Sequence, residues 1–259
     1  MFKGFELPFT GFKNPDDQNK YKIKGEKLFK EYENIVFKKL DGFLKPNGNI
    51  DGTELIENWF PSIECDIFIS HSHTDHDIAL QFAGYMNEHF GLKCFIDSCI
   101  WGYSNDLLKE IDSKLSKIND NRYDYNSRNF TTGHVHMMLA TALCQMIYNT
   151  ECLILLKTTN SIPKSINEIV NRTQSAWIYL EIKMSRLLDK KTLNDYRKLR
   201  RLKFSKGMVT ENIDYVIDTD HLTKITWSDL QNTKKQYIPG THPLDLLYKL
   251  TENNELVNS

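Results

Sequence analysis

The sequence predicts an α/β protein with an open, mainly parallel sheet that is covered by helices on both faces. Three short apolar runs carry this prediction, at residues 65–70, 92–97 and 152–157. Each run is rich in β-branched or aromatic residues and is bounded by polar residues, which is typical of buried parallel strands. Segments with helical spacing separate them, and this alternation favours an open parallel sheet.

Residues 1–62 are expected to form an N-terminal extension that carries one helix. Apolar residues over 25–40 are spaced for one helical face, and prolines and the Asp51–Gly52 pair interrupt the rest as turns. The sheet domain is expected over residues 63–250, and residues 251–259 are expected to form a C-terminal tail.

Within the sheet domain the helices are expected between the strands. They are predicted at residues 77–90, about 105–118, 135–148, 175–188 and 243–250. Gly91 supplies a stop for the first of them, and Ser175 is placed to cap the fourth. Loops are expected at 98–104 and 119–132, and two weaker strand segments around Asp220, within 214–225.

Charge and hydropathy exclude several classes of protein. The 33 basic residues balance 34 acidic ones, so a nucleic-acid partner bound through bulk positive charge is not expected, although residues 197–206 form a local basic patch. A composition of 40% hydrophobic and 26% charged residues is ordinary for a globular protein. The most apolar stretch, 136–156, contains Gln145, Asn149 and Glu151, so no membrane span is expected.

The cysteines indicate a cytoplasmic protein. There are five, an odd count, and no two form a CxxC pair. Cys65, Cys94 and Cys152 lie in the strand-like runs, which favours buried, reduced thiols. Cys94, Cys99 and Cys152 are expected to be inert, because no base lies beside them in the sequence. The N-terminus also lacks the apolar segment of a secretory signal.

Polar residues follow each predicted strand, at Ser70–His71, Asp97–Ser98 and Lys157–Thr158. In open parallel sheets ligands bind at the carboxyl ends of the strands, so we expect the functional site there. The pattern GxGxxG does not occur, which argues against dinucleotide binding of the dehydrogenase type.

One local motif suggests a metal. His71, His73, Asp75 and His76 resemble the HxHxDH motif of metallo-β-lactamase-fold hydrolases, which could hold zinc and acidify a bound water. Residues 77–80 run directly into a predicted helix, where that family has small residues, and the expected upstream strands are missing. We therefore expect no metal, and a polar loop that places His71 near a ligand.

Several separate segments resemble a Toll/interleukin-1 receptor (TIR) domain. The opening CDIFISHSHTDHDIALQFAGYMNEHFGLKCFIDSCIWG, residues 65–102, has a strand ending in Phe-Ile-Ser-His, a helix, a second strand and an aromatic loop with Trp101. SAWIYLE, residues 175–181, is similar to the Ser-x-Trp…Glu element of the family's third helix. Trp177 and Glu181 have the WxxxE spacing common in bacterial members. The resemblance covers about residues 64–190.

The resemblance implies a flavodoxin-like fold and cleavage of the nicotinamide–ribose bond of NAD, with Glu181 as the catalytic carboxylate. NAD is then the substrate, and no other cofactor is expected. Trp101 is the best candidate to stack on nicotinamide or adenine, with Tyr103 in reserve. The residues expected to contact NAD are Ser70, His71, Ser72, Asp97, Ser98, Trp101, Tyr103 and Trp177.

A carboxylate suits this reaction because the ribose becomes cationic as the bond to nicotinamide breaks. Glu181 is four residues after Trp177, so both side chains lie on one helical face. Trp177 is expected to position the helix by packing more than to touch the substrate.

The resemblance also implies partners. TIR enzymes act as assemblies, so a homo-oligomer formed through TIR–TIR contacts is expected. Stand-alone TIR chains occur in anti-phage defence systems such as Thoeris, in which the nucleotide product signals to a separate effector protein. A non-catalytic TIR scaffold stays open as the alternative, and a buried or salt-bridged Glu181 would favour it.

Overall fold

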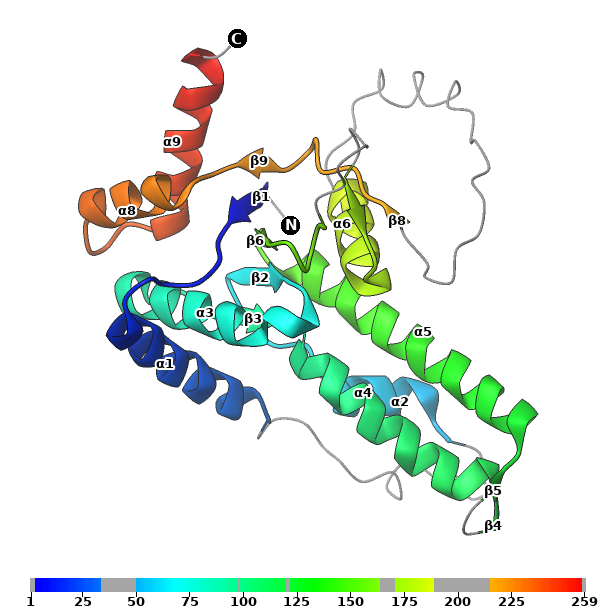
Figure 1. The fold of residues 1–259 in the computed structure, drawn as a ribbon. Helices are drawn as coiled ribbons and strands as arrows, with labels where there is room; N and C mark the ends of the chain where they lie inside the picture. The colour runs from blue at the N-terminus through cyan, green and yellow to red at the C-terminus, as the bar shows by residue number, and fades with distance from the viewer. Residues whose placement is uncertain are drawn as a thin grey trace, which may run out of the picture.

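The computed structural model of the chain describes residues 3–33, 50–96, 98–119, 122–163, 171–188 and 215–257. Its centre is a five-stranded sheet with the strand order β3-β2-β6-β1-β9 (Figure 1). The strands are β1 (Lys3–Pro8), β2 (Ile67–Ser70), β3 (Cys94–Ile96), β6 (Cys152–Lys157) and β9 (Thr223–Lys224). All neighbouring pairs are parallel, so the predicted fold class is confirmed.

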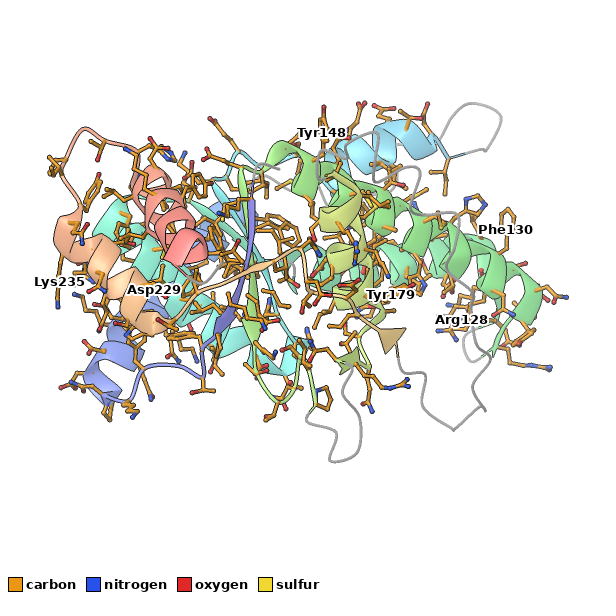
Figure 2. The ribbon with its side chains drawn as sticks, turned by 90° about the horizontal axis from the view of Figure 1, so that it is seen from above. Arg128, Phe130, Tyr148, Tyr179, Asp229 and Lys235 are labelled. Carbon is orange, nitrogen blue, oxygen red and sulfur yellow. The ribbon has the colours of Figure 1, made fainter. Side chains whose placement is uncertain are left out.

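Helices form a layer on each face of the sheet, which Figure 2 shows nearly edge-on. One layer contains α1 (Pro15–Glu33), α3 (His76–Phe90), α8 (Trp227–Gln236) and α9 (Pro243–Val257). The other contains α2 (Gly52–Trp59), α4 (Ser98–Ile111), α5 (Tyr125–Asn149) and α6 (Ala176–Leu188). No helix in these described parts of the chain is long and apolar enough to span a membrane.

Several short elements lie outside the main sheet and the long helices. A 3₁₀ turn (His73–Asp75) leads into α3, and a π-helical turn (Asp112–Ser116) follows α4. Two antiparallel pairs lie outside the main sheet, β4 (Lys117–Asn119) with β5 (Arg122–Tyr123) and β7 (Arg172–Thr173) with β8 (Tyr215–Val216). The two strand segments predicted within 214–225 are therefore present as β8 and β9, in different sheets.

The N-terminal strand β1 lies inside the main sheet, between β6 and β9. It pairs with β6 from Lys3↔Cys152 to Pro8↔Lys157, and Phe5 and Leu7 are fully buried. The prediction that residues 1–62 precede the sheet domain as an extension is therefore wrong for this strand. Gly4, Glu6 and Pro8 alternate with its apolar residues, and strands disfavour these residue types, so the sequence gives no clear strand signal.

The C-terminal boundary predicted at residue 250 is also wrong. Helix α9 continues to Val257, and Thr251 is 2% exposed. The Lys3 ammonium donates to the Thr251 hydroxyl at 3.2 Å, so this part of α9 packs beside the start of β1.

The three strands predicted from continuous apolar runs are confirmed, and β6 has the predicted bounds. Their residues are almost all buried because helices cover both faces, which is why the runs show no alternation. Helix α3 ends at Gly91, whose φ of 69° is left-handed, and the Ile178 amide donates to Ser175 Oγ at 3.2 Å to cap α6.

Several helices begin earlier than predicted. Helix α1 begins at Pro15 rather than residue 25, and the rest of that predicted helix, 34–40, lies outside the described residues. Helix α4 occupies the predicted loop 98–104, and α5 begins within the predicted loop 119–132. Gly102 and Gly133 interrupt the apolar pattern there, yet a helix tolerates glycine at a cost of about 1 kcal/mol.

The Asp51–Gly52 pair begins a helix instead of forming a turn. The Asp51 carboxylate accepts from the amides of Thr53 and Glu54, both at 3.1 Å, and so caps α2. Aspartate is favoured at this position because its oxygen satisfies amides that have no partner within the helix.

Candidate functional site

Buried polar side chains gather where the central strands end. Strand β2 lies between β3 and β6 in the sheet. The chain therefore adds β3 on one side of β2 and later adds β6 on the opposite side of β2, which reverses the strand order. In open α/β sheets this reversal opens a crevice for ligands at the carboxyl ends of the strands. The buried polar residues at these ends and on the elements packed over them are Glu6, Ser70, His71, Asp75, Thr158, Ser161 and Glu181.

The structure brings Ser70 and Glu181 into contact, although they lie 111 residues apart. Ser70 ends β2, Glu181 lies on α6, and both side chains are 0% exposed. The Ser70 hydroxyl donates to Glu181 Oε2 at 2.6 Å. Because Ile178 and Ile182 bury the same face of α6, the helix holds the carboxylate against the end of the strand.

His71 and Ser72 follow Ser70 in the loop that leaves β2. His71 is 1% exposed, its Nδ1 lies 3.5 Å from the Ile69 carbonyl oxygen, and its ring lies 6.3 Å from that of His76. Ser72 is partly exposed, and its hydroxyl lies 3.0 Å from that of Thr74. His71 is therefore one of the buried polar residues at the carboxyl ends of the strands, whereas Ser72 makes its hydrogen bond within its own loop.

Trp177 packs between helices. It is partly buried, and its ring meets the His136 ring of α5 edge-on at 6.1 Å. The ring contact joins α5 and α6, and the predicted contact of Trp177 with NAD stays a prediction.

Four predicted contact residues follow β3. Asp97 lies outside the described residues, and the backbone of Ser98, Trp101 and Tyr103 belongs to the first turns of α4. Their side chains also lie outside the described part, so their contact with NAD stays a prediction.

A network missed by the sequence analysis ties the loop after β2 to the loop after β6. Asp75 is 3% exposed, accepts from the Thr158 hydroxyl, and accepts from Asn160 Nδ2 at 2.6 Å. Ser161 Oγ accepts from the Thr158 amide at 2.9 Å and donates to the Leu156 carbonyl at 2.9 Å. The polar run 158–161 directly after an apolar strand was the available signal.

The zinc interpretation of the histidine motif finds no matching set of donors. Asp75 is occupied by Thr158 and Asn160, and His73 is exposed. Among the residues whose placement is described, no group of three or more His, Cys, Asp or Glu side chains could hold a metal ion. We derive no reaction step through zinc.

The cysteines whose side chains are described are not activated nucleophiles. Cys65, Cys94, Cys144 and Cys152 are not in disulfide bonds, and the side chain of Cys99 lies outside the described part. Burial raises the pKa of Cys65 to about 11 and holds the pKa of Cys94 and of Cys152 well above the ordinary thiol value. At neutral pH these groups are protonated, and a thiol is a far weaker nucleophile than a thiolate.

Comparison with protein-family models, with curated proteins and with solved structures gave no match. The resemblance to TIR domains therefore rests on the sequence segments 65–102 and 175–181 alone.

Proposed function

We propose that the protein cleaves the nicotinamide–ribose bond of NAD and forms ADP-ribose, or a cyclised or otherwise modified ADP-ribose. The observation that carries this proposal is the hydrogen bond between Ser70 and Glu181. It fixes a carboxylate at the carboxyl end of β2, next to the reversal of strand order at which α/β proteins bind ligands.

In the proposed reaction the C1′–N bond breaks and nicotinamide leaves with the bonding electron pair, which makes it neutral. The ribose is left as an oxocarbenium-like cation. The Glu181 carboxylate stabilises this positive charge, and the hydrogen bond from the Ser70 hydroxyl orients the carboxylate before the reaction begins. A water molecule, or a nucleophile of the same substrate, then bonds to C1′ and releases any proton to solvent.

A non-catalytic scaffold is the second candidate, and the burial of Glu181 favours it. The carboxylate is 0% exposed and already accepts from Ser70, so it could serve only to hold α6 against β2. Burial also suits catalysis, because charges interact more strongly away from water. The two functions therefore differ in whether Glu181 changes a reaction rate.

The test is incubation of the purified protein with NAD, followed by mass spectrometry of the products. Wild-type protein is expected to release nicotinamide together with an ADP-ribose-derived product, and Glu181→Gln is expected to release neither at a comparable rate. A folded wild-type protein that leaves NAD intact at every concentration tried would favour the scaffold.

The cellular setting follows from the resemblance. We propose a cytoplasmic enzyme that assembles through TIR–TIR contacts and whose product signals to a separate effector protein in anti-phage defence. The four described cysteines, all free thiols, support a reducing compartment.

A further inference from the structure

A further buried carboxylate lies on the N-terminal strand. Glu6 of β1 is 3% exposed, and Lys157 Nζ donates to its Oε1 at 2.8 Å. Its other oxygen, Oε2, is buried and has no hydrogen-bond partner among the described residues. A buried carboxylate oxygen without a donor is unfavourable, and in native proteins such a group commonly meets a ligand or water.

The register of the strands places Glu6 on the same face of the sheet as the Ser70–Glu181 pair. Ser70 is paired with Leu155 of β6, and Leu155 is paired with Glu6 of β1. Directly paired residues of parallel strands point to the same face, and two strand spacings are roughly 10 Å. Glu6 therefore lies at the level of Ser70, two strands away.

Helix α6 extends over this part of the sheet. Glu181 contacts the end of β2, and Ser185, one turn later, lies with its Oγ 2.8 Å from His221 Nε2 in the segment that precedes β9. Strand β1 lies between β2 and β9 in the sheet order. The buried face of α6 thus contacts the end of β2 through Glu181 and the segment before β9 through Ser185, and β1 lies between these two strands in the sheet order.

We propose that Glu6 is a second ligand-binding carboxylate of this site, where Oε2 accepts a hydrogen bond from a ribose hydroxyl. Lys157, whose side chain is 30% exposed, offers its ammonium to the diphosphate of the same ligand. The inference rests on the proposed function for the identity of the ligand. A dinucleotide carries two riboses joined by a diphosphate, so one molecule can engage Glu181 and Glu6 together.

The test measures binding of ADP-ribose by calorimetry, because this molecule keeps both riboses and the diphosphate but has no nicotinamide to lose. Glu6→Gln is expected to weaken binding about tenfold or more, as loss of a hydrogen bond to a charged group does. Glu6→Asp keeps the charge opposite Lys157 but retracts the acceptor, so it is expected to weaken binding as well. It replaces Glu6→Gln if that variant does not fold.

The matched control is Glu64→Gln, which makes the same change at an exposed position before β2, and its dissociation constant should stay within about twofold of wild type. Wild-type affinity in both Glu6 variants would overturn the inference, and so would a wild-type protein that does not bind ADP-ribose. If the wild-type protein cleaves NAD but the Glu6 variants bind ADP-ribose as tightly as wild type, the inference about Glu6 fails and the proposed function stands. If the Glu6 variants weaken binding of ADP-ribose but the wild-type protein does not cleave NAD, the proposed function fails and the inference about Glu6 stands.

Discussion

At the scale of single residues, the hydroxyl of Ser70 is expected to stabilise the fold as well as orient Glu181. Ser70→Ala removes the donor at 2.6 Å from a buried carboxylate oxygen. Leaving a buried acceptor without its donor costs about 1–3 kcal/mol. Urea unfolding should show this loss, while Ser72→Ala, at a partly exposed hydroxyl in the following loop, should change stability by about 0.5 kcal/mol or less. Equal stability of the two variants would mean that Glu181 does not depend on Ser70.

The sequence identifies Ser70, His71 and Glu181 because a strand end or a motif marks each of them. It does not mark Glu6 or Asn160 as candidates for the site. Glu6 contacts Lys157, which lies 151 residues away, as a result of strand pairing. Asn160 contacts Asp75, which lies 85 residues away, through a contact between two loops. No local pattern records such contacts, so they become visible only in the folded chain.

At the scale of elements, helices α1 and α3 pack through reciprocal glycines. A Cβ on Gly84 would lie 1.9 Å from the Tyr21 carbonyl oxygen, and a Cβ on Gly25 would lie 2.1 Å from that of Leu80. Gly84→Ala must therefore push the helices apart, and overpacking of this kind costs about 1–3 kcal/mol or more.

The control for this prediction is Gly133→Ala in α5, where an added Cβ meets nothing within 4 Å. That variant should gain about 0.5–1 kcal/mol, because alanine favours a helix over glycine. Chemical denaturation of both variants is the measurement. A Gly84→Ala protein as stable as wild type would show that the helices do not approach this closely.

The junction of α1, α3 and α8 should make stability depend on pH. Burial lowers the pKa of the His89 side chain. The nearby positive charges of Lys234, Lys20 and Lys24 lower this pKa further, and the negative charge of Glu88 raises it. The Tyr21 hydroxyl also lies 2.8 Å from His89 Nε2. In the unfolded chain His89 binds a proton near its ordinary pKa of 6.5, whereas in the folded chain it binds the proton only at lower pH. Stability is therefore lost as the pH falls below 6.5 and through the folded pKa.

Replacing the group isolates its contribution. His89→Gln, which cannot titrate, should show a smaller loss of stability between pH 7 and pH 5 than wild type. Urea unfolding at a series of pH values makes the comparison, and identical slopes would exclude His89 as a source of the dependence.

Helix starts are harder to predict than the three strands with continuous apolar sequences. The apolar runs of β2, β3 and β6 stand out because burial on both faces leaves few polar residues in them. The starts of α1, α4 and α5 contain polar residues or glycines that also suit loops, and packing against neighbouring elements decides the outcome.

At the scale of the whole molecule, the first residues of the chain complete the sheet. Leu7→Ala on β1 removes a side chain that is 0% exposed and should cost about 2–5 kcal/mol. Ile23→Ala, on α1 at 56% exposure, lies within the same predicted extension and should change stability by about 0.5 kcal/mol or less. Thermal unfolding distinguishes the two, and a mild effect of Leu7→Ala would restore the view of residues 1–62 as an appendage.

The central claim is that the carboxylate of Glu181 acts on the ribose of NAD. The direct measurement is the rate of nicotinamide release by wild type, Glu181→Gln and Lys183→Gln, the last a partly exposed change on the same helix. We expect a loss of about 10²-fold or more for Glu181→Gln and a wild-type rate for Lys183→Gln. A folded Glu181→Gln protein that releases nicotinamide as fast as wild type would contradict the central claim.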